Sequence, residues 1–319
     1  MLLVASIYKG AQSEMKILSL WLGGGEDYSS EMGGTNNNEV ISRVDNDDDN
    51  SNARYEYLYG DDPYEFNEEA FDLLKQNHKF AEWVEFSGWN QEQIDFLCSI
   101  DWERDKNVIS NNTKLKTLSI EGDRGILGEM DDKRMKFIRS ADCFYHSIAG
   151  NRTLKNLTID RSMLDTPETI KILSPFIENN HNLDHLVLGK LVLDSKSVSK
   201  LANALSKSNL STFGLECCNG MTAGFMTQII DAVGVIGIQN LFLNEYDMDD
   251  DVGIALGKSL CKHNTLKTLS LNGKRDYETY PPTLMAAIVE SFVNGSLEKL
   301  YLGLKVARLL LEDFHTIQH

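Results

Sequence analysis

The sequence predicts an α/β solenoid in which short parallel strands line one face and helices cover the other. Three observations carry this prediction. A six-residue pattern with three apolar positions occurs seven times between Leu115 and Leu302. Successive copies begin 39, 29, 27, 28, 28 and 31 residues apart, a period typical of stacked repeats. The residues between the copies include apolar positions at helical spacing, such as Val198, Leu201 and Leu205.

The seven copies read LKTLSI, LKNLTI, LDHLVL, LSTFGL, IQNLFL, LKTLSL and LEKLYL. Within each copy the apolar positions alternate, so that Leu269 and Leu271 point inward while Thr268 and Ser270 point outward. Side by side, such strands form a parallel sheet with helices over one face. A degenerate copy, AEWVEF at 81–86, precedes them with Val84 and Phe86 inward, so we expect about eight repeats.

Composition divides the chain into three parts. We expect residues 1–54 to form a disordered acidic segment, because 23–54 are rich in Gly, Asn, Ser and Asp and offer little apolar surface to bury. Residues 55–110 are predicted to form an N-terminal cap that includes a helix near 68–76 and the degenerate first repeat. Residues 111–319 form the repeat domain, with insertions near 122–131 and 274–282 expected on one rim.

The charge of the chain restricts the kinds of partner that it can bind, and its cysteines indicate the cellular compartment. The net charge is −17, and residues 1–110 hold 23 acidic and 8 basic side chains, so a nucleic-acid backbone would be repelled. Five scattered cysteines favour reduced thiols. No stretch has the composition of a signal peptide or a membrane span. We therefore expect a cytoplasmic, monomeric protein without nucleic-acid or membrane partners, with a nuclear location as the alternative.

The repeats resemble the ribonuclease-inhibitor class of leucine-rich repeats over about residues 80–319. The segment IQNLFLNEYDMDDDVGIALGKSLCKHN matches best, through apolar residues such as Leu241, Leu243 and Leu256. The resemblance implies a horseshoe whose concave parallel sheet faces a partner protein. Members of this class inhibit enzymes, sense ligands, select substrates for ubiquitination or activate the Ran GTPase.

The chain departs from that class at one position. The class carries an asparagine after the six-residue segment, where its side chain satisfies backbone groups of the turn. Here that position is occupied by other residues: Asp123, Ser162, Leu191, Cys218, Tyr246, Lys274 and Lys305. The sequence therefore predicts that this asparagine ladder is absent, and that a buried cysteine takes its place in one repeat.

Several motifs suggest chemistry but fit the repeat pattern better. GIALGKS (253–259) lacks the glycine spacing of a phosphate-binding loop and overlaps a predicted helix. The aspartates at 247 and 249–251 precede that helix, where carboxylates interact favourably with exposed backbone N–H groups. His181 and His185 lie four apart but straddle a helix-to-strand junction. We predict no catalytic, cofactor or metal site, and an enzyme assembled from scattered residues is the remote alternative.

The outward strand positions form the candidate site, because they mix polar groups with large aromatic rings, as protein-binding patches do. We predict that a protein partner contacts nine of them together with the rim loops: Trp83, Glu85, Glu121, Asp160, His185, Glu216, Phe242, Asn244 and Tyr301. One alternative is that these are ordinary solvated strand positions. A second is a GTPase-activating regulator of the Ran-directed type.

Overall fold

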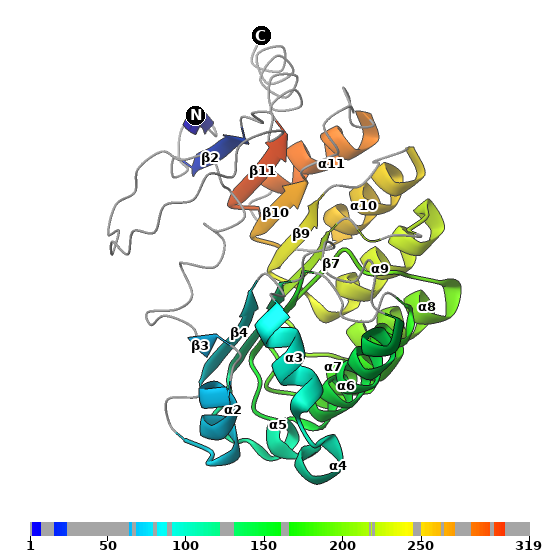
Figure 1. Ribbon diagram of the computed structural model, residues 1–319. Coiled ribbons are helices and arrows are strands. Elements are labelled where there is room, and N and C mark those ends of the chain that lie inside the picture. Colours follow the sequence, from blue (N-terminus) through cyan, green and yellow to red (C-terminus); the bar gives the residue numbers. More distant parts are fainter. Residues whose placement is uncertain are drawn as a thin grey trace, which may run out of the picture.

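The six-residue segments form strands and the segments between them form helices, in an alternating order along the chain (Figure 1). The computed structural model describes residues 2–7, 16–23, 64–65, 68–78, 82–87, 91–121, 131–160, 166–216, 218, 221–244, 250–262, 265–271, 282–293 and 297–303. The fold is therefore α/β with an open, mostly parallel sheet, as predicted, and its alternation of strand and helix is compatible with a solenoid.

The sheet follows the chain order from β3 to β11, and all of these strands are parallel. The strands are β3 (Tyr64–Glu65), β4 (Trp83–Ser87), β5 (Thr117–Glu121), β6 (Asn156–Ile159), β7 (His185–Gly189), β8 (Thr212–Glu216), β9 (Asn240–Asn244), β10 (Thr268–Leu271) and β11 (Lys299–Gly303). Corresponding positions of successive repeats lie opposite each other, for example Leu186 opposite Phe213. The register therefore preserves the repeat.

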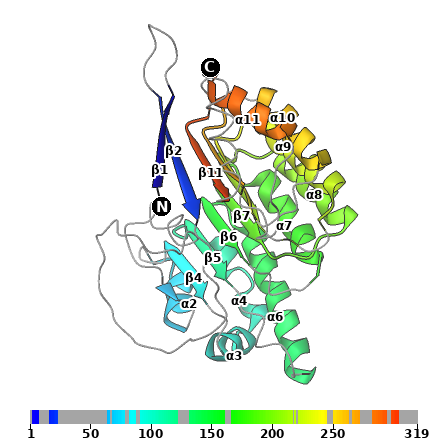
Figure 2. The ribbon, with the colours of Figure 1, turned by 90° about the horizontal axis from the view of Figure 1, so that it is seen from above.

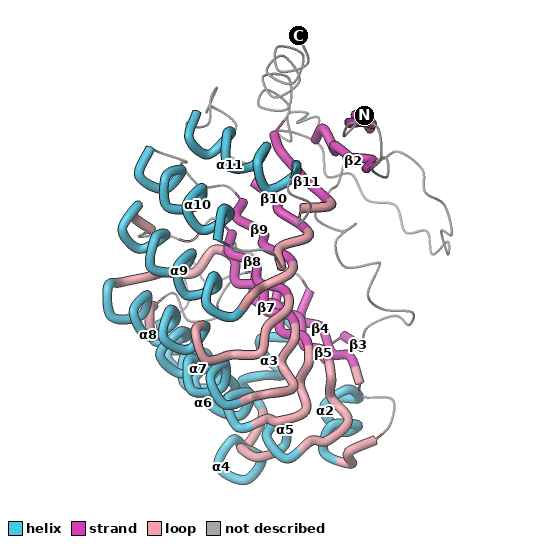
Figure 3. Tube along the Cα trace, turned by 180° about the vertical axis from the view of Figure 1, so that it is seen from behind, coloured by secondary structure: helices cyan, strands magenta, loops and turns pink. Residues whose placement is uncertain are grey.

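Helices after β5 lie side by side on one face of the sheet, as Figures 1 and 3 show. They are α6 (Asp131–Gly150), α7 (Glu168–Asn179), α8 (Ser195–Leu205), α9 (Ala223–Ile236), α10 (Asp250–Lys262) and α11 (Pro282–Val293). Each packs against the next in the series. Some of them begin at a capping residue. Before α8, the Asp194 side chain accepts a hydrogen bond from the Ser197 amide at 2.6 Å, and the Ser197 hydroxyl oxygen accepts one from the Asp194 amide.

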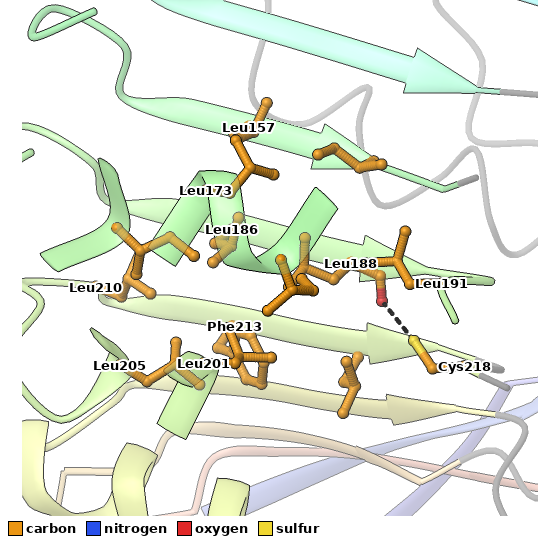
Figure 4. Close-up of a cluster of buried hydrophobic side chains, with 14 of the residues drawn as sticks. Leu157, Leu173, Leu186, Leu188, Leu191, Leu201, Leu205, Leu210, Phe213 and Cys218 are labelled. Carbon is orange, nitrogen blue, oxygen red and sulfur yellow. Dashed lines mark hydrogen bonds between the residues drawn. The ribbon is translucent and has the colours of Figure 1, made fainter. Parts of the chain in front are cut away.

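The core lies between the sheet and these helices (Figure 4). Inward strand residues such as Leu186 and Phe213 meet Leu201 and Leu205 of α8, and all four are fully buried. Cys218 is also buried, and its thiol donates to the Leu188 carbonyl oxygen at 3.9 Å. This cysteine therefore occupies the interior at the turn after β8, as predicted. Burial of a continuous apolar spine is what holds one repeat to the next.

The degenerate first repeat has the predicted register. Val84 is buried and pairs with Leu118, so Trp83 and Glu85 lie on the same sheet face as Thr117 and Ser119. Short helices follow: α3 (Gln91–Ser99), α4 (Trp102–Asp105) and α5 (Val108–Asn111).

The predicted helix near 68–76 is α2 (Glu68–Lys75), with Phe71 and Leu74 buried. The Trp102 ring of α4 joins α2 to α6, because its centroid lies 6.1 Å from the ring centroids of both Phe71 and Phe144. Helices α2, α4 and α6 therefore share one aromatic cluster.

The structure differs from the prediction for residues 1–54 at two strands, β1 (Leu2–Ile7) and β2 (Lys16–Gly23). β2 pairs in parallel with β11 and β1 pairs antiparallel with β2, so the beginning of the chain extends the far edge of the sheet (Figure 2). The segments LLVASI and KILSLWLG contain β-branched and aromatic residues that favour strands, and the composition argument for disorder, which rested on residues 23–54, did not take them into account. Residues 24–63 and the predicted rim insertions, apart from their ends, lie outside the described residues.

Candidate functional site

Outward strand residues form rows across the face of the sheet opposite α6–α11, and we call this the open face. Because the strands are parallel and in register, each outward position lies beside the same position of the next repeat. The first row contains Trp83, Thr117, Asn156, His185, Thr212, Asn240, Thr268 and Lys299. The second contains Glu85, Ser119, Thr158, Val187, Gly214, Phe242, Ser270 and Tyr301. The third, at the carboxyl ends of the strands, contains Ser87, Glu121, Gly189, Glu216 and Asn244.

Eight of the nine predicted site residues belong to these rows, and the ninth, Asp160, directly follows β6. Glu216 and Asn244 come into direct contact. Trp83 and Glu85 on β4 are seven strands from Tyr301 on β11, or about 34 Å along the sheet. The nine residues therefore cannot act as one small site. They are spread along the sheet from β4 to β11, with Glu121 on β5 and Asp160 after β6 between the two ends.

Hydrogen bonds connect the third row near β8–β10. The Asn244 amide donates to a Glu216 carboxylate oxygen at 2.8 Å, and the Ser270 hydroxyl donates to the Asn244 carbonyl at 3.0 Å. Asn244 is 4% exposed and Ser270 is 1% exposed. Of the predicted contact residues, Asn244 is therefore positioned to orient Glu216 rather than to present its own surface to a partner.

A neighbouring ion pair joins Asp160, a predicted contact residue, to Lys190, to which the sequence assigned no role. Lys190 donates from Nζ to Asp160 Oδ2 at 2.9 Å, and from its amide to the Glu216 carbonyl at 2.8 Å. Its φ of 49° lies in the left-handed region, which is uncommon for residues other than glycine. The position before it is a glycine, Gly189, and a Cβ at Gly189 would lie only 2.6 Å from Asp160 Oδ1, so a larger residue at 189 would collide with Asp160. In the sequence, this ion pair was indicated only by the position of Gly189 and Lys190, which directly follow the six-residue segment LDHLVL, with acidic residues in the neighbouring repeats.

The first row repeats one polar pair. Asn156 donates to the Thr117 hydroxyl, and Asn240 donates to the Thr212 hydroxyl, both at 3.0 Å. Between the pairs lies His185, whose Nδ1 is 2.8 Å from Asp184 Oδ2. Burial lowers the pKa of His185 below its usual value of 6.5, and the nearby Asp184 carboxylate offsets only part of that effect. At neutral pH His185 therefore presents an uncharged ring to this row.

Other sequence motifs lie where the repeat pattern predicts. GIALGKS is part of α10, which begins at Asp250, so these residues form a helix rather than a phosphate-binding loop. His181 is exposed in the turn before β7, whereas His185 lies within β7, so the two histidines do not share a helix face. The described residues include no group of three His, Cys, Asp or Glu side chains that could hold a metal ion.

A scan against protein-family models finds no match, and a search of curated proteins finds no similar sequence. Within the part of the chain that the structure describes, no helix has the length and apolar character needed to cross a membrane.

Proposed function

We propose that this protein is a non-catalytic binding module that holds a partner protein against its open face. The observation that carries the proposal is the second row of that face. There Val187, Phe242 and Tyr301, all half-buried, alternate with the small residues Gly214 and Ser270. Hydrogen-bonded amides and carboxylates lie in the rows on either side. Aromatic anchors surrounded by oriented polar groups are characteristic of protein-binding surfaces.

We also propose that the repeats are leucine-rich repeats, which would make the open face the concave side of a horseshoe. The three apolar positions of each copy support this, because the first, fourth and sixth residues are buried in repeat after repeat. In the copy that contains β7 these are Leu183, Leu186 and Leu188. Copies centred on β5, β6, β8, β9 and β10 follow the same rule. Stacked repeats of this kind form an extended continuous surface, although the core of each repeat is small, and such a surface suits recognition of a large partner.

The polar side chains of the open face would contribute to binding because neighbouring residues already hold them in a fixed orientation. Glu216 is held by Asn244, and Asp160 is held by Lys190. Such fixed groups lose little conformational freedom on binding, and preorganisation of this kind favours affinity. We assign them to recognition of a partner.

Affinity purification of the tagged full-length chain from its native cells tests the proposal. We expect the double substitution Phe242→Ala and Tyr301→Ala to reduce recovery of the co-purifying protein about tenfold or more, because buried aromatic anchors dominate interface energetics. Val235→Ala is the matched control, since Val235 is 73% exposed on α9, on the helical side. Circular dichroism should show all variants folded. Equal recovery with the double variant and the control would show that the open face is not the binding surface.

A further inference from the structure

Strand β2 carries the apolar pattern of the repeat strands, although it lies far from them in the sequence. The segment ILSLWLG (17–23) has apolar residues at its first, fourth and sixth positions, as LEKLYLG (297–303) does around β11. The structure pairs the two segments in matching register, with Leu20 opposite Leu300, and this register continues to the glycine that ends each segment. β2 therefore occupies the place beside β11 that a further repeat strand would take.

The attachment of β2 differs from that of the repeat strands. From β5 to β10 a helix follows each strand, and these helices pack against one another. The β1–β2 hairpin contacts the rest of the described structure mainly through β11, and Figure 2 shows it beside that strand and away from the helices. A two-stranded hairpin is marginally stable by itself, so it depends on β11 for its structure. The hairpin can therefore leave the sheet as one unit while the helices stay packed.

The chain that connects β2 to β3 is long. β3 lies at the opposite edge of the sheet, nine strand spacings from β2, which corresponds to about 43 Å. The connection is residues 24–63, and a chain of 40 residues can extend over about 130 Å. The connection is therefore long enough for β2 to reach the β11 strand of a neighbouring molecule.

We propose that a second copy of this chain docks its own β1–β2 hairpin on β11, so that two copies exchange hairpins and form a strand-swapped dimer. Every copy carries the one segment that the structure shows on this edge, residues 16–23. Monomer and dimer contain the same strand pairs, so exchange loses no contact. The connection favours the monomer only by holding the hairpin at an effective concentration on the order of a millimolar. The fraction of dimer should therefore rise with protein concentration.

Disulfide trapping between two full-length chains tests the exchange. One chain carries Ser19→Cys and the other, marked by a different affinity tag, carries Lys299→Cys, because these residues lie directly opposite each other in the pairing of β2 with β11. Neighbouring strands are about 4.8 Å apart, a separation that a disulfide can join. Under mild oxidation we expect a disulfide between positions 19 and 299 of different chains, identified by peptide mass spectrometry. Its yield should increase with protein concentration.

Two controls separate docking on β11 from random oxidation. In the first, Thr268→Cys replaces Lys299→Cys, because Thr268 lies opposite Lys299 on β10, one strand farther from β2. The yield should fall about tenfold or more, since about 10 Å is beyond the reach of a disulfide. In the second, Leu18→Pro and Leu20→Pro are added to the Ser19→Cys chain. The trapped bond should disappear, because proline cannot donate to the strand ladder.

A single chain that carries both Ser19→Cys and Lys299→Cys completes the test. If this chain forms the disulfide internally while the mixed chains form none at any concentration, the hairpin stays with its own β11 and the exchange is refuted. If neither sample forms the bond, β2 does not occupy this edge and the proposal fails as well. The docking edge is the backbone of β11 and not the open face, so the Phe242 and Tyr301 double variant still tests the proposed function separately.

Discussion

Buried asparagines close the turns that lead from helix to strand. Asn151 donates to the carbonyl oxygens of Ile109 and Asn112, at 2.7 and 3.0 Å, and accepts from the amides of Thr153 and Leu154. Asn112 and Asn180 make bonds of the same kind in the repeats before and after it. The protein therefore has an asparagine ladder, located before the strands rather than after them.

We expect Asn151→Ala to lower the free energy of unfolding by about 2–4 kcal/mol, because it leaves several buried backbone groups without partners. Asn151 is 0% exposed, so water cannot replace the lost bonds. Urea denaturation measures the change. Asn209→Ala, an exposed asparagine in a later turn of the same type, should stay within about 0.5 kcal/mol of the unmodified protein. A similarly small effect at Asn151 would mean that the ladder is not stabilising.

Individual helices depend on their end residues as well as on the shared core. Helix α9 begins after Thr222, whose hydroxyl accepts from the Phe225 amide, and ends at Gly237 in the left-handed conformation with φ 68° and ψ 45°. That backbone conformation lets the chain reverse into β9, and it penalises any residue that has a Cβ. Gly237 at the end of the helix and Gly224 in its first turn therefore have opposite requirements.

Substitution of these glycines should change stability in opposite directions. Gly237→Ala should cost about 1–2 kcal/mol for conformational reasons, because its Cβ would meet only ordinary contacts with Thr265 at 3.5 Å. Gly224→Ala, in the first turn of α9, meets nothing within 4 Å and should stabilise by about 0.5–1 kcal/mol through helix propensity. Thermal denaturation of both variants gives the comparison. Destabilisation by both would contradict the assignment of Gly224 to an unstrained helical position.

At the scale of the whole molecule, each repeat is stabilised mainly by its two neighbours. From β3 to β11 consecutive strands pair, and from α6 to α11 consecutive helices pack, so these contacts follow the order of the chain; the pairing of β2 with β11 is the exception. The apolar spine passes through every repeat without interruption from Phe71 to Leu300. Stability in such an array is approximately a sum of repeat terms and nearest-neighbour interfaces.

Phe213→Ala in the central strand β8 tests this organisation. The side chain is fully buried, so the cavity should cost about 3–5 kcal/mol. Amide hydrogen exchange should show the largest loss of protection in β7, β8 and β9, with smaller losses in β4 and β5. Val235→Ala, the exposed control on α9, should leave the exchange pattern unchanged. A uniform loss in every strand would instead indicate one cooperative unit.

The alternation and period of the leucines were sufficient to predict strands β4–β11, helices of the repeats such as α7, α8 and α10, and which residues of those strands face outward. His185, Glu216 and Phe242 lie in the predicted rows because outward direction follows from period two within each strand. Two short strands in residues 1–54 escaped prediction, since the disorder prediction rested on the composition of residues 23–54. The role of Lys190 also escaped, because its partner Asp160 belongs to the previous repeat, 30 residues earlier.

Periodicity is a local property, so the sequence by itself determined the repeat unit, its buried spine and the identity of its outward face. Only the tertiary structure decided which outward side chains meet. Glu216 and Asn244 are 28 residues apart, and Asn151 and Ile109 are 42 apart, yet each pair is in direct contact. Those contacts depend on the register in which neighbouring repeats stack, and that register arises from packing between units rather than from the pattern within any one of them.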